Sequence, residues 1–223
     1  LQLSNTNKFA PGRLLMAGHH GRYTWDSIWY SDDHAKTWKV STNATTGQPL
    51  KLLGLDEPAL AETPSGGVTV RARNMKLFHG EGKCNCRGKA DSINGGTSFQ
   101  GHVGFDPGLP SPVCQGTMIN DGPGIIYSSM PGYGTPTEKK DAHDGRGNGI
   151  VRWSKDGGNS WLGNVSLWHG QAYSYSCLTH VPAEGFIGLA WETVLPNSGP
   201  HKRDISANNV LFTLIPTQAQ LKK

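Results

Sequence analysis

The sequence predicts an all-β protein built from short strands. Its 223 residues include 30 Gly and 14 Pro, which mark many tight turns, while hydrophobic residues make up only 35%. This balance favours short strands over long helices, and a single all-β domain of this length has room for a good core. No segment repeats apolar residues at sustained spacings of three and four, so we expect little helix.

Strand-like runs recur along the chain between clusters of Gly, Pro, Asn and Asp. In chain order, the clearest are Arg13–Gly18, Thr24–Tyr30, Gly67–Arg73, Gly124–Ser129, Gly149–Trp153, Tyr173–His180, Gly185–Glu192 and Asn208–Ile215. Clusters of Pro and Gly predict loops at Pro107–Pro112 and Pro131–Pro136. The segment Met75–Gln100, rich in Gly, Lys, Asn and Ser, is interpreted as a long insertion loop.

A turn frame of the form Ser-x-Asp-x-small-x-Thr/Ser-Trp occurs twice, at Ser31–Trp38 and at Ser154–Trp161. The carboxylates of Asp33 and Asp156 can accept backbone N–H groups across a tight turn, and we expect each frame's Trp to pack over that turn. Both aspartates are therefore predicted to be structural. The copies begin 123 residues apart, which suits two or three propeller blades of roughly 40–60 residues each.

The charge pattern favours a small anionic ligand over nucleic acid. The net charge is +4, and no run of Lys and Arg is long enough for a nucleic-acid stripe. No apolar run approaches membrane-spanning length, so no membrane span is expected.

The four cysteines permit disulfides, and Cys84-Asn85-Cys86 predicts a loop disulfide or free thiols. Its one-residue spacing does not fit a zinc knuckle, so no metal is expected. Acceptor triplets for glycosylation begin at Asn43 and Asn164 and favour a secretory route. We therefore expect a secreted or lumenal protein, with the lysosome among the possible compartments.

The candidate site consists of Tyr175, Glu57, Arg73, Arg146 and Glu192. A tyrosine can act as nucleophile on a sugar that carries its own negative charge, because a neutral phenol is not repelled as a carboxylate would be. A phenol titrates near pH 10, so it needs a base beside it, and Glu57 is the candidate. Arg73 lies 16 positions after Glu57 on a predicted hairpin, and a guanidinium can bind a carboxylate through two parallel hydrogen bonds.

Two neighbouring residues compete for these roles. Tyr173 lies on the same predicted strand face as Tyr175, and the following Ser-x-Leu-Thr favours Tyr175. Arg71 shares a face with Arg73, but the spacing from Glu57 selects Arg73. We expect Arg71 to be solvated or to support Arg73.

The repeated frame is the Asp-box, and together with these residues it resembles the sialidases (neuraminidases), which are six-bladed β-propellers. The resemblance runs from about residue 10 to residue 215. It rests on Glu57-Pro58, the strand Val68–Asn74, Cys114-Gln115-Gly116, Arg146 before the second frame, Tyr175-Ser176-Cys177-Leu178 and Glu192.

The resemblance implies an exo-α-sialidase that removes terminal sialic acid with retention of configuration. Tyr175 would be the nucleophile and Glu57 its base, Arg73 and Arg146 would bind the substrate carboxylate, and Glu192 would hold another arginine of the site. No cofactor is needed. The substrates would be sialylated glycoproteins, glycolipids or oligosaccharides.

Two residues of the family's site have no match in this sequence, the first carboxylate-binding arginine and the acid/base aspartate. Arg13 opens the strand of an inner blade, and Asp26 lies too close to the first turn frame. We therefore expect residues 1–223 to form a partial propeller domain of about four blades, with N-terminal blades missing, that is inactive by itself. The alternatives are a non-catalytic, lectin-like propeller that binds sialic acid, and a propeller that serves only as a scaffold for protein contacts.

Overall fold

A computed structural model describes residues 1–21, 24–78, 84–122, 124–132, 146–181, 185–193 and 209–217. Almost all of its regular structure is β. The first sheet contains β1 (Leu14–His20), β2 (Trp25–Ser31), β3 (Lys39–Val40) and β5 (Leu52–Leu53). The second contains β6 (Leu55–Glu62), β7 (Val68–Asn74), β8 (Cys86–Ser92) and β10 (Gly104–Pro110).

The third sheet contains β11 (Thr117–Asn120), β12 (Ile126–Gly132), β13 (Gly147–Ser154) and β14 (Leu162–Ala172). The fourth contains β15 (Ser176–His180), β16 (Phe186–Thr193) and β17 (Asn209–Pro216). The short strands β4 (Thr42–Asn43) and β9 (Ser98–Phe99) form a parallel pair, and α1 (Met75–Phe78) is a single helical turn. No helix in these ranges has the length and apolar character needed to cross a membrane.

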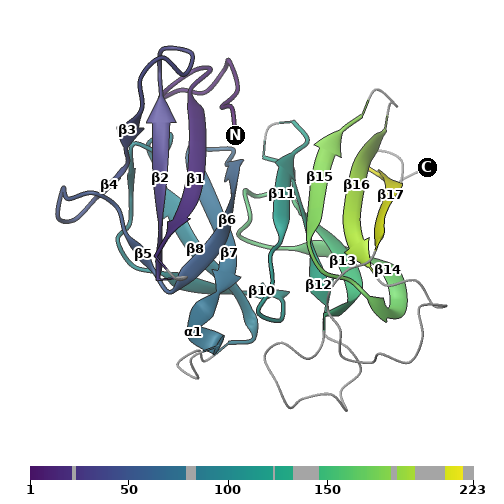
Figure 1. Cartoon of the computed structure of the whole chain (residues 1–223). Coiled ribbons are helices and arrows are strands. Elements are labelled where there is room, and N and C mark those ends of the chain that lie inside the picture. Colours follow the sequence, from purple (N-terminus) through teal and green to yellow (C-terminus); the bar gives the residue numbers. More distant parts are fainter. Residues whose placement is uncertain are drawn as a thin grey trace.

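The four sheets follow one another around a common centre, as Figure 1 shows. Each sheet places its first strand at the centre, and these strands contact in sequence, β1 with β6, β6 with β11 and β11 with β15. Within each sheet the paired strands are antiparallel. This is the arrangement of four propeller blades, and it confirms the predicted fold.

Apolar side chains fill the spaces between neighbouring blades. One cluster joins the first two sheets through residues such as Leu15, Ile28, Leu55 and Val70. A second cluster joins the last two sheets. Because the cores lie between sheets, burial of apolar surface fixes each blade against the next.

The two turn frames have the hydrogen bonds that the sequence predicts. In the first, Asp33 accepts from the Thr37 amide at 2.8 Å and from the Thr37 hydroxyl at 2.6 Å. In the second, Asp156 accepts the equivalent bonds from Ser160 at 2.9 and 2.6 Å. Hydrogen bonds from Thr37 and Ser31 lower the pKa of Asp33 to about 2, so its carboxylate stays ionised.

A third copy of the frame, Ser92–Phe99, was not recognised in the sequence because Asn94 stands in the aspartate position. Its bonds to the backbone are of the same kind: the Asn94 side-chain oxygen accepts from the Ser98 amide at 3.0 Å, and Ser92 Oγ accepts from the Gly96 amide at 2.9 Å. The bond to the hydroxyl is reversed, because Asn94 Nδ2 donates to Ser98 Oγ at 2.9 Å. The frames begin at residues 31, 92 and 154, one in each of the first three blades.

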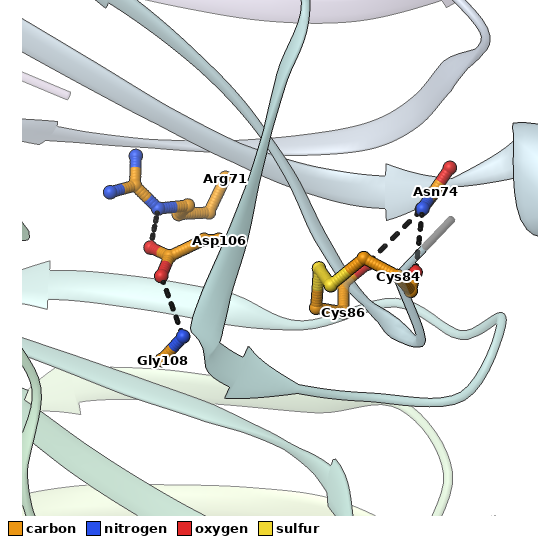
Figure 2. Close-up of a disulfide and its surroundings, with 6 residues drawn as sticks. All are labelled: Arg71, Asn74, Cys84, Cys86, Asp106 and Gly108. Atoms are coloured by element: carbon orange, nitrogen blue, oxygen red, sulfur yellow. Dashed lines mark hydrogen bonds and ion pairs between the residues drawn. A yellow bond between two sulfur atoms is a disulfide. The ribbon is translucent and has the colours of Figure 1, made fainter. Parts of the chain in front are cut away.

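Arg71 corrects the expectation of a solvated side chain. Its side chain is 1% exposed rather than solvated, and its Nε donates to Asp106 at 2.5 Å (Figure 2). Its Nη2 donates to the Gly158 carbonyl in the turn frame of the next blade, at 2.7 Å. Trp161 lies beside Gly158 of its own turn, as predicted, and its indole N–H also donates to the same Asp106 at 2.9 Å. Arg71 therefore joins two blades, and its hydrogen bonds offset the cost of burying its charge.

Two predicted loops are wrong in part. The segment Met75–Gln100 contains β8, a central strand of the second sheet, and Pro107–Pro112 overlaps β10, where prolines are tolerated because β10 is an edge strand with an irregular register. Most of Pro131–Pro136 lies outside the described residues.

Cys84 and Cys86 form a disulfide at the start of β8, and the Asn74 side-chain amide donates to the carbonyls of both, at 3.3 Å each (Figure 2).

Candidate active site

Tyr175 lies just before β15, at the centre of the propeller. Its phenol oxygen donates a hydrogen bond of 2.5 Å to Glu57 Oε1. Burial raises the pKa of Tyr175 to about 12, and the hydrogen bond to Glu57 adds to the rise. The resting phenol is therefore neutral, and its proton is already directed at a carboxylate.

A β-bulge directs Glu57 towards the tyrosine. The register of β6 and β7 shifts between Asp56 and Ala59, and Glu57 has a φ angle of 49°, in the left-handed region. A non-glycine residue in this region carries conformational strain, which persists where the surrounding structure holds it. In a regular strand, side chains point alternately to the two faces of the sheet. The bulge breaks this alternation at Glu57 and directs its side chain towards Tyr175.

Arg73 and Arg146 both lie close to the Tyr175 side chain. Arg73 Nη1 donates to Glu57 Oε2 at 3.2 Å and to the Tyr175 oxygen at 3.4 Å. The guanidinium carbon of Arg146 lies 5.9 Å from the centre of the Tyr175 ring. Arg146 is held by the Val113 carbonyl at 3.0 Å and by Ser174 Oγ at 3.4 Å. Four of the five predicted residues thus form one cluster drawn from three blades.

Tyr173, the competing tyrosine, belongs to the core. Its hydroxyl shares a 2.5 Å hydrogen bond with Ser129, its ring stacks on Trp191, and it is fully buried. The expectation that it shares a strand face with Tyr175 is wrong, because both tyrosines precede β15. The geometry leaves Tyr175 as the candidate nucleophile.

Glu192 supports Tyr175 in a way that the sequence did not predict. The arginine that its carboxylate is expected to hold is the one without a match in this sequence, so that expectation stays a prediction. Its Oε2 accepts from the Tyr175 amide at 3.4 Å, and its own amide donates to the Tyr175 carbonyl at 2.8 Å. Glu192 thus fixes the backbone of the tyrosine.

Two carboxyl groups close to Glu57 are buried, which the sequence did not predict, although Asp26 was weighed there as an acid. Asp26 and Asp56 are both 0% exposed, and none of their four oxygens has a hydrogen-bond partner within the described ranges. Burial raises the pKa of Asp26 to about 8, with further contributions from the charges of Asp56 and Glu57. Burial also raises the pKa of Asp56, whereas His19, 3.3 Å away, and Arg73 oppose the rise. Sequence pattern gave no signal for this pair, because burial of an aspartate depends on which blades face each other.

We predict that Asp26→Asn stabilises the protein at alkaline pH but not at acidic pH. The pKa of Asp26 is raised from 3.8 to about 8, so the folded state holds this proton more tightly than the unfolded chain. The associated stability is complete below about pH 4 and is lost as the pH rises through about 8. At pH 8.5 the asparagine variant should gain about 1–3 kcal/mol, because asparagine cannot ionise and so avoids the burial of an unpaired charge.

Thermal unfolding of both proteins at pH 4.5 and pH 8.5 measures this difference. Equal melting temperatures at pH 8.5 would contradict the raised pKa of Asp26. A difference of the same size at both pH values would mean that the substitution acts through packing.

A cavity of about 770 Å³ runs along the centre of the propeller between β1, β6 and β11. Glu57, His19 and Gln115 are among its lining residues, whereas Tyr175, Arg73 and Arg146 are not. Glu57 is therefore the point at which the cavity meets the cluster. Within the described ranges, no group of three or more His, Cys, Asp or Glu side chains is arranged to hold a metal ion.

The architecture defines a sialidase-like β-propeller. No family model matches the sequence. The structure is similar to the intramolecular trans-sialidase from Ruminococcus gnavus in complex with oseltamivir carboxylate, with a TM-score of 0.68, 20% identity, and coverage of 100% of this chain and 44% of that one.

Two further solved structures give the same result. The leech intramolecular trans-sialidase complexed with 2,7-anhydro-Neu5Ac has a TM-score of 0.61 and 22% identity, covering 97% of this chain and 30% of that one. Trypanosoma rangeli sialidase in complex with the inhibitor DANA has a TM-score of 0.59 and 14% identity, covering 95% and 30%. The chain spans less than half of the length of each of these three structures.

Proposed function

We propose that the protein is an exo-α-sialidase that removes terminal sialic acid with retention of configuration. The observation that carries the proposal is the 2.5 Å hydrogen bond from the Tyr175 phenol to Glu57, with Arg73 bonded to both groups. Sialidases are the glycosidases that use a tyrosine nucleophile in place of a carboxylate. A protein that only binds sialic acid needs the arginines but has no use for a phenol paired with a base.

In the proposed reaction, Arg73 and Arg146 hold the substrate carboxylate and thereby place the anomeric carbon next to the Tyr175 oxygen. The phenol proton moves to Glu57 as the oxygen forms a bond to that carbon, and the bond to the leaving oxygen breaks. The leaving oxygen takes a proton from an acid outside the cluster described here. Water then attacks the anomeric carbon and gives its proton to the same external group, which restores that acid. The bond to Tyr175 breaks, and Glu57 returns the phenol proton to the tyrosine.

We further propose that residues 1–223 represent a partial propeller domain and that the complete protein supplies the remaining carboxylate-binding arginine and the acid. The substrates would be sialylated glycoproteins, glycolipids or oligosaccharides in a secreted or lumenal compartment. The cluster requires no cofactor for this chemistry.

We predict that Arg73→Met weakens binding of a sialic-acid analogue to the full-length protein by about 10- to 100-fold. The reason is the loss of a charge-assisted hydrogen bond, which contributes about 1.5–3 kcal/mol. Lys36→Met is the matched control, because it removes one positive charge from an exposed turn. Calorimetric titration with the unsaturated analogue DANA measures both variants, and equal affinities would contradict a binding role for Arg73.

The full-length protein should also release the fluorophore from a fluorogenic sialoside. Binding of DANA without release would favour the lectin-like alternative. Neither binding nor release would favour a scaffold.

A further inference from the structure

Gln115 connects two blades beside the candidate nucleophile. It lies just before β11, and its side-chain Nε2 donates to the Ser176 carbonyl at 3.1 Å. Its Oε1 accepts from the Ser176 amide at 2.9 Å. One side-chain amide thus makes both hydrogen bonds that a neighbouring strand would make to Ser176.

The opposite end of β11 has a matching contact. Asn120 Nδ2 donates to the Glu62 carbonyl at 2.8 Å, and its Oδ1 accepts from the Glu62 amide at 2.8 Å. We call these two contacts the Gln115 clamp and the Asn120 clamp. They join β11 to β15 on one side and to β6 on the other. These three inner strands belong to different sheets and do not pair through their backbones, so the side-chain amides supply hydrogen bonds between the blades.

The Gln115 clamp acts on the residue that follows Tyr175. Tyr175 itself lies outside a strand, and Glu192 fixes its backbone from the β16 side. The clamp fixes the adjoining peptide from the β11 side. The phenol must remain within 2.5 Å of Glu57, which lies two blades away on β6. The Asn120 clamp holds β6 at Glu62, five residues beyond Glu57.

We propose that Gln115 is a positioning residue, whose amide fixes the start of β15 so that the Tyr175 phenol stays bonded to Glu57. As far as it concerns turnover, this inference rests on the proposed sialidase activity. The contact between phenol and carboxylate is independent of that activity.

The test compares Gln115→Ala with Asn120→Ala in the full-length protein. Each substitution removes one amide clamp of the same chemistry, so both should lower the melting temperature by similar amounts. Only Gln115→Ala should lower kcat for a fluorogenic sialoside, by about 10- to 100-fold, because misplacement of a reacting group by about 1 Å costs about 10²-fold. KM should change little, since Arg73 and Arg146 remain.

A second measurement separates the position of the tyrosine from turnover. In protein labelled with ¹³C at tyrosine Cζ, the Tyr175 signal is assigned by its loss in Tyr175→Phe. Gln115→Ala should shift this signal towards that of a free phenol, whereas Asn120→Ala should leave it unchanged. Gln115→Glu is the milder variant if the alanine variant fails to fold, because an ionised glutamate still accepts from the Ser176 amide but cannot donate to its carbonyl.

The outcomes distinguish the two proposals. A shifted signal in a protein without turnover supports the positioning role and rejects the sialidase. Normal turnover together with an unchanged signal in both Gln115 variants overturns the positioning role. Equal losses of kcat in Gln115→Ala and Asn120→Ala also overturn it, because they would indicate general loosening of the blades.

Discussion

Replacing Tyr175 by phenylalanine is expected to lower kcat of the full-length protein for a fluorogenic sialoside by about 10³-fold or more. Removing the nucleophile of a covalent mechanism usually has an effect of this size. Affinity for DANA should change little, because the guanidinium groups of Arg73 and Arg146 remain. Steady-state kinetics and calorimetric titration measure the two effects separately.

Two further substitutions test whether the effect belongs to the phenol and its base. Glu57→Gln keeps the shape of the side chain but removes the base, and kcat should fall by about 10²- to 10⁴-fold. Tyr173→Phe is the matched control, because it removes a buried hydroxyl from the same segment and should cost only about 1 kcal/mol of stability. A Tyr175→Phe variant that retained more than a tenth of the activity would exclude the tyrosine as nucleophile.

Replacing Arg71 by methionine is expected to lower the free energy of unfolding by about 3–5 kcal/mol. The substitution leaves the Asp106 carboxylate in a nearly buried position without its cation, which is the costly way to break a buried ion pair. It also removes the hydrogen bond to Gly158 that holds the next blade. Urea unfolding followed by tryptophan fluorescence measures the loss.

The double variant Arg71→Met with Asp106→Asn should be less destabilised than the sum of the two single variants, by at least about 1 kcal/mol. In the wild type the Trp161 indole donates to Oδ2 of Asp106 and the Gly108 amide donates to Oδ1 (Figure 2 draws the Gly108 contact), and asparagine keeps an acceptor for one of these two donors. Additive losses would show that Arg71 stabilises the fold through packing alone.

Turn residues and alternating strands were enough to predict the blades, because the signals for a hairpin lie within a short stretch of sequence. The strand β8 was missed because Cys86–Ser92 contains Arg87, Gly88 and Lys89, which do not alternate as a half-buried strand does. It is buried through its position in the middle of a sheet. The third turn frame was missed because Asn94 replaces the expected aspartate. Its side-chain oxygen nevertheless accepts a hydrogen bond from the backbone amide four residues later, as Asp33 and Asp156 do.

The candidate site was predictable to the extent that its residue types are specialised. A tyrosine, a glutamate and two arginines in a family-like order pointed to one cluster. The contact of the Gln115 amide and the buried Asp26–Asp56 pair were not predictable, because each depends on which strands of different blades become neighbours. Contacts between distant segments carry no local signal in a single sequence.

The cluster draws Glu57 and Arg73 from the second blade, Arg146 from the third and Tyr175 from the start of the fourth. No single blade holds all four residues, so duplication of one blade could extend the propeller without copying the cluster. The cluster forms where the blades meet, and the gain or loss of a blade would change the distance between the Tyr175 phenol oxygen and Glu57 Oε1.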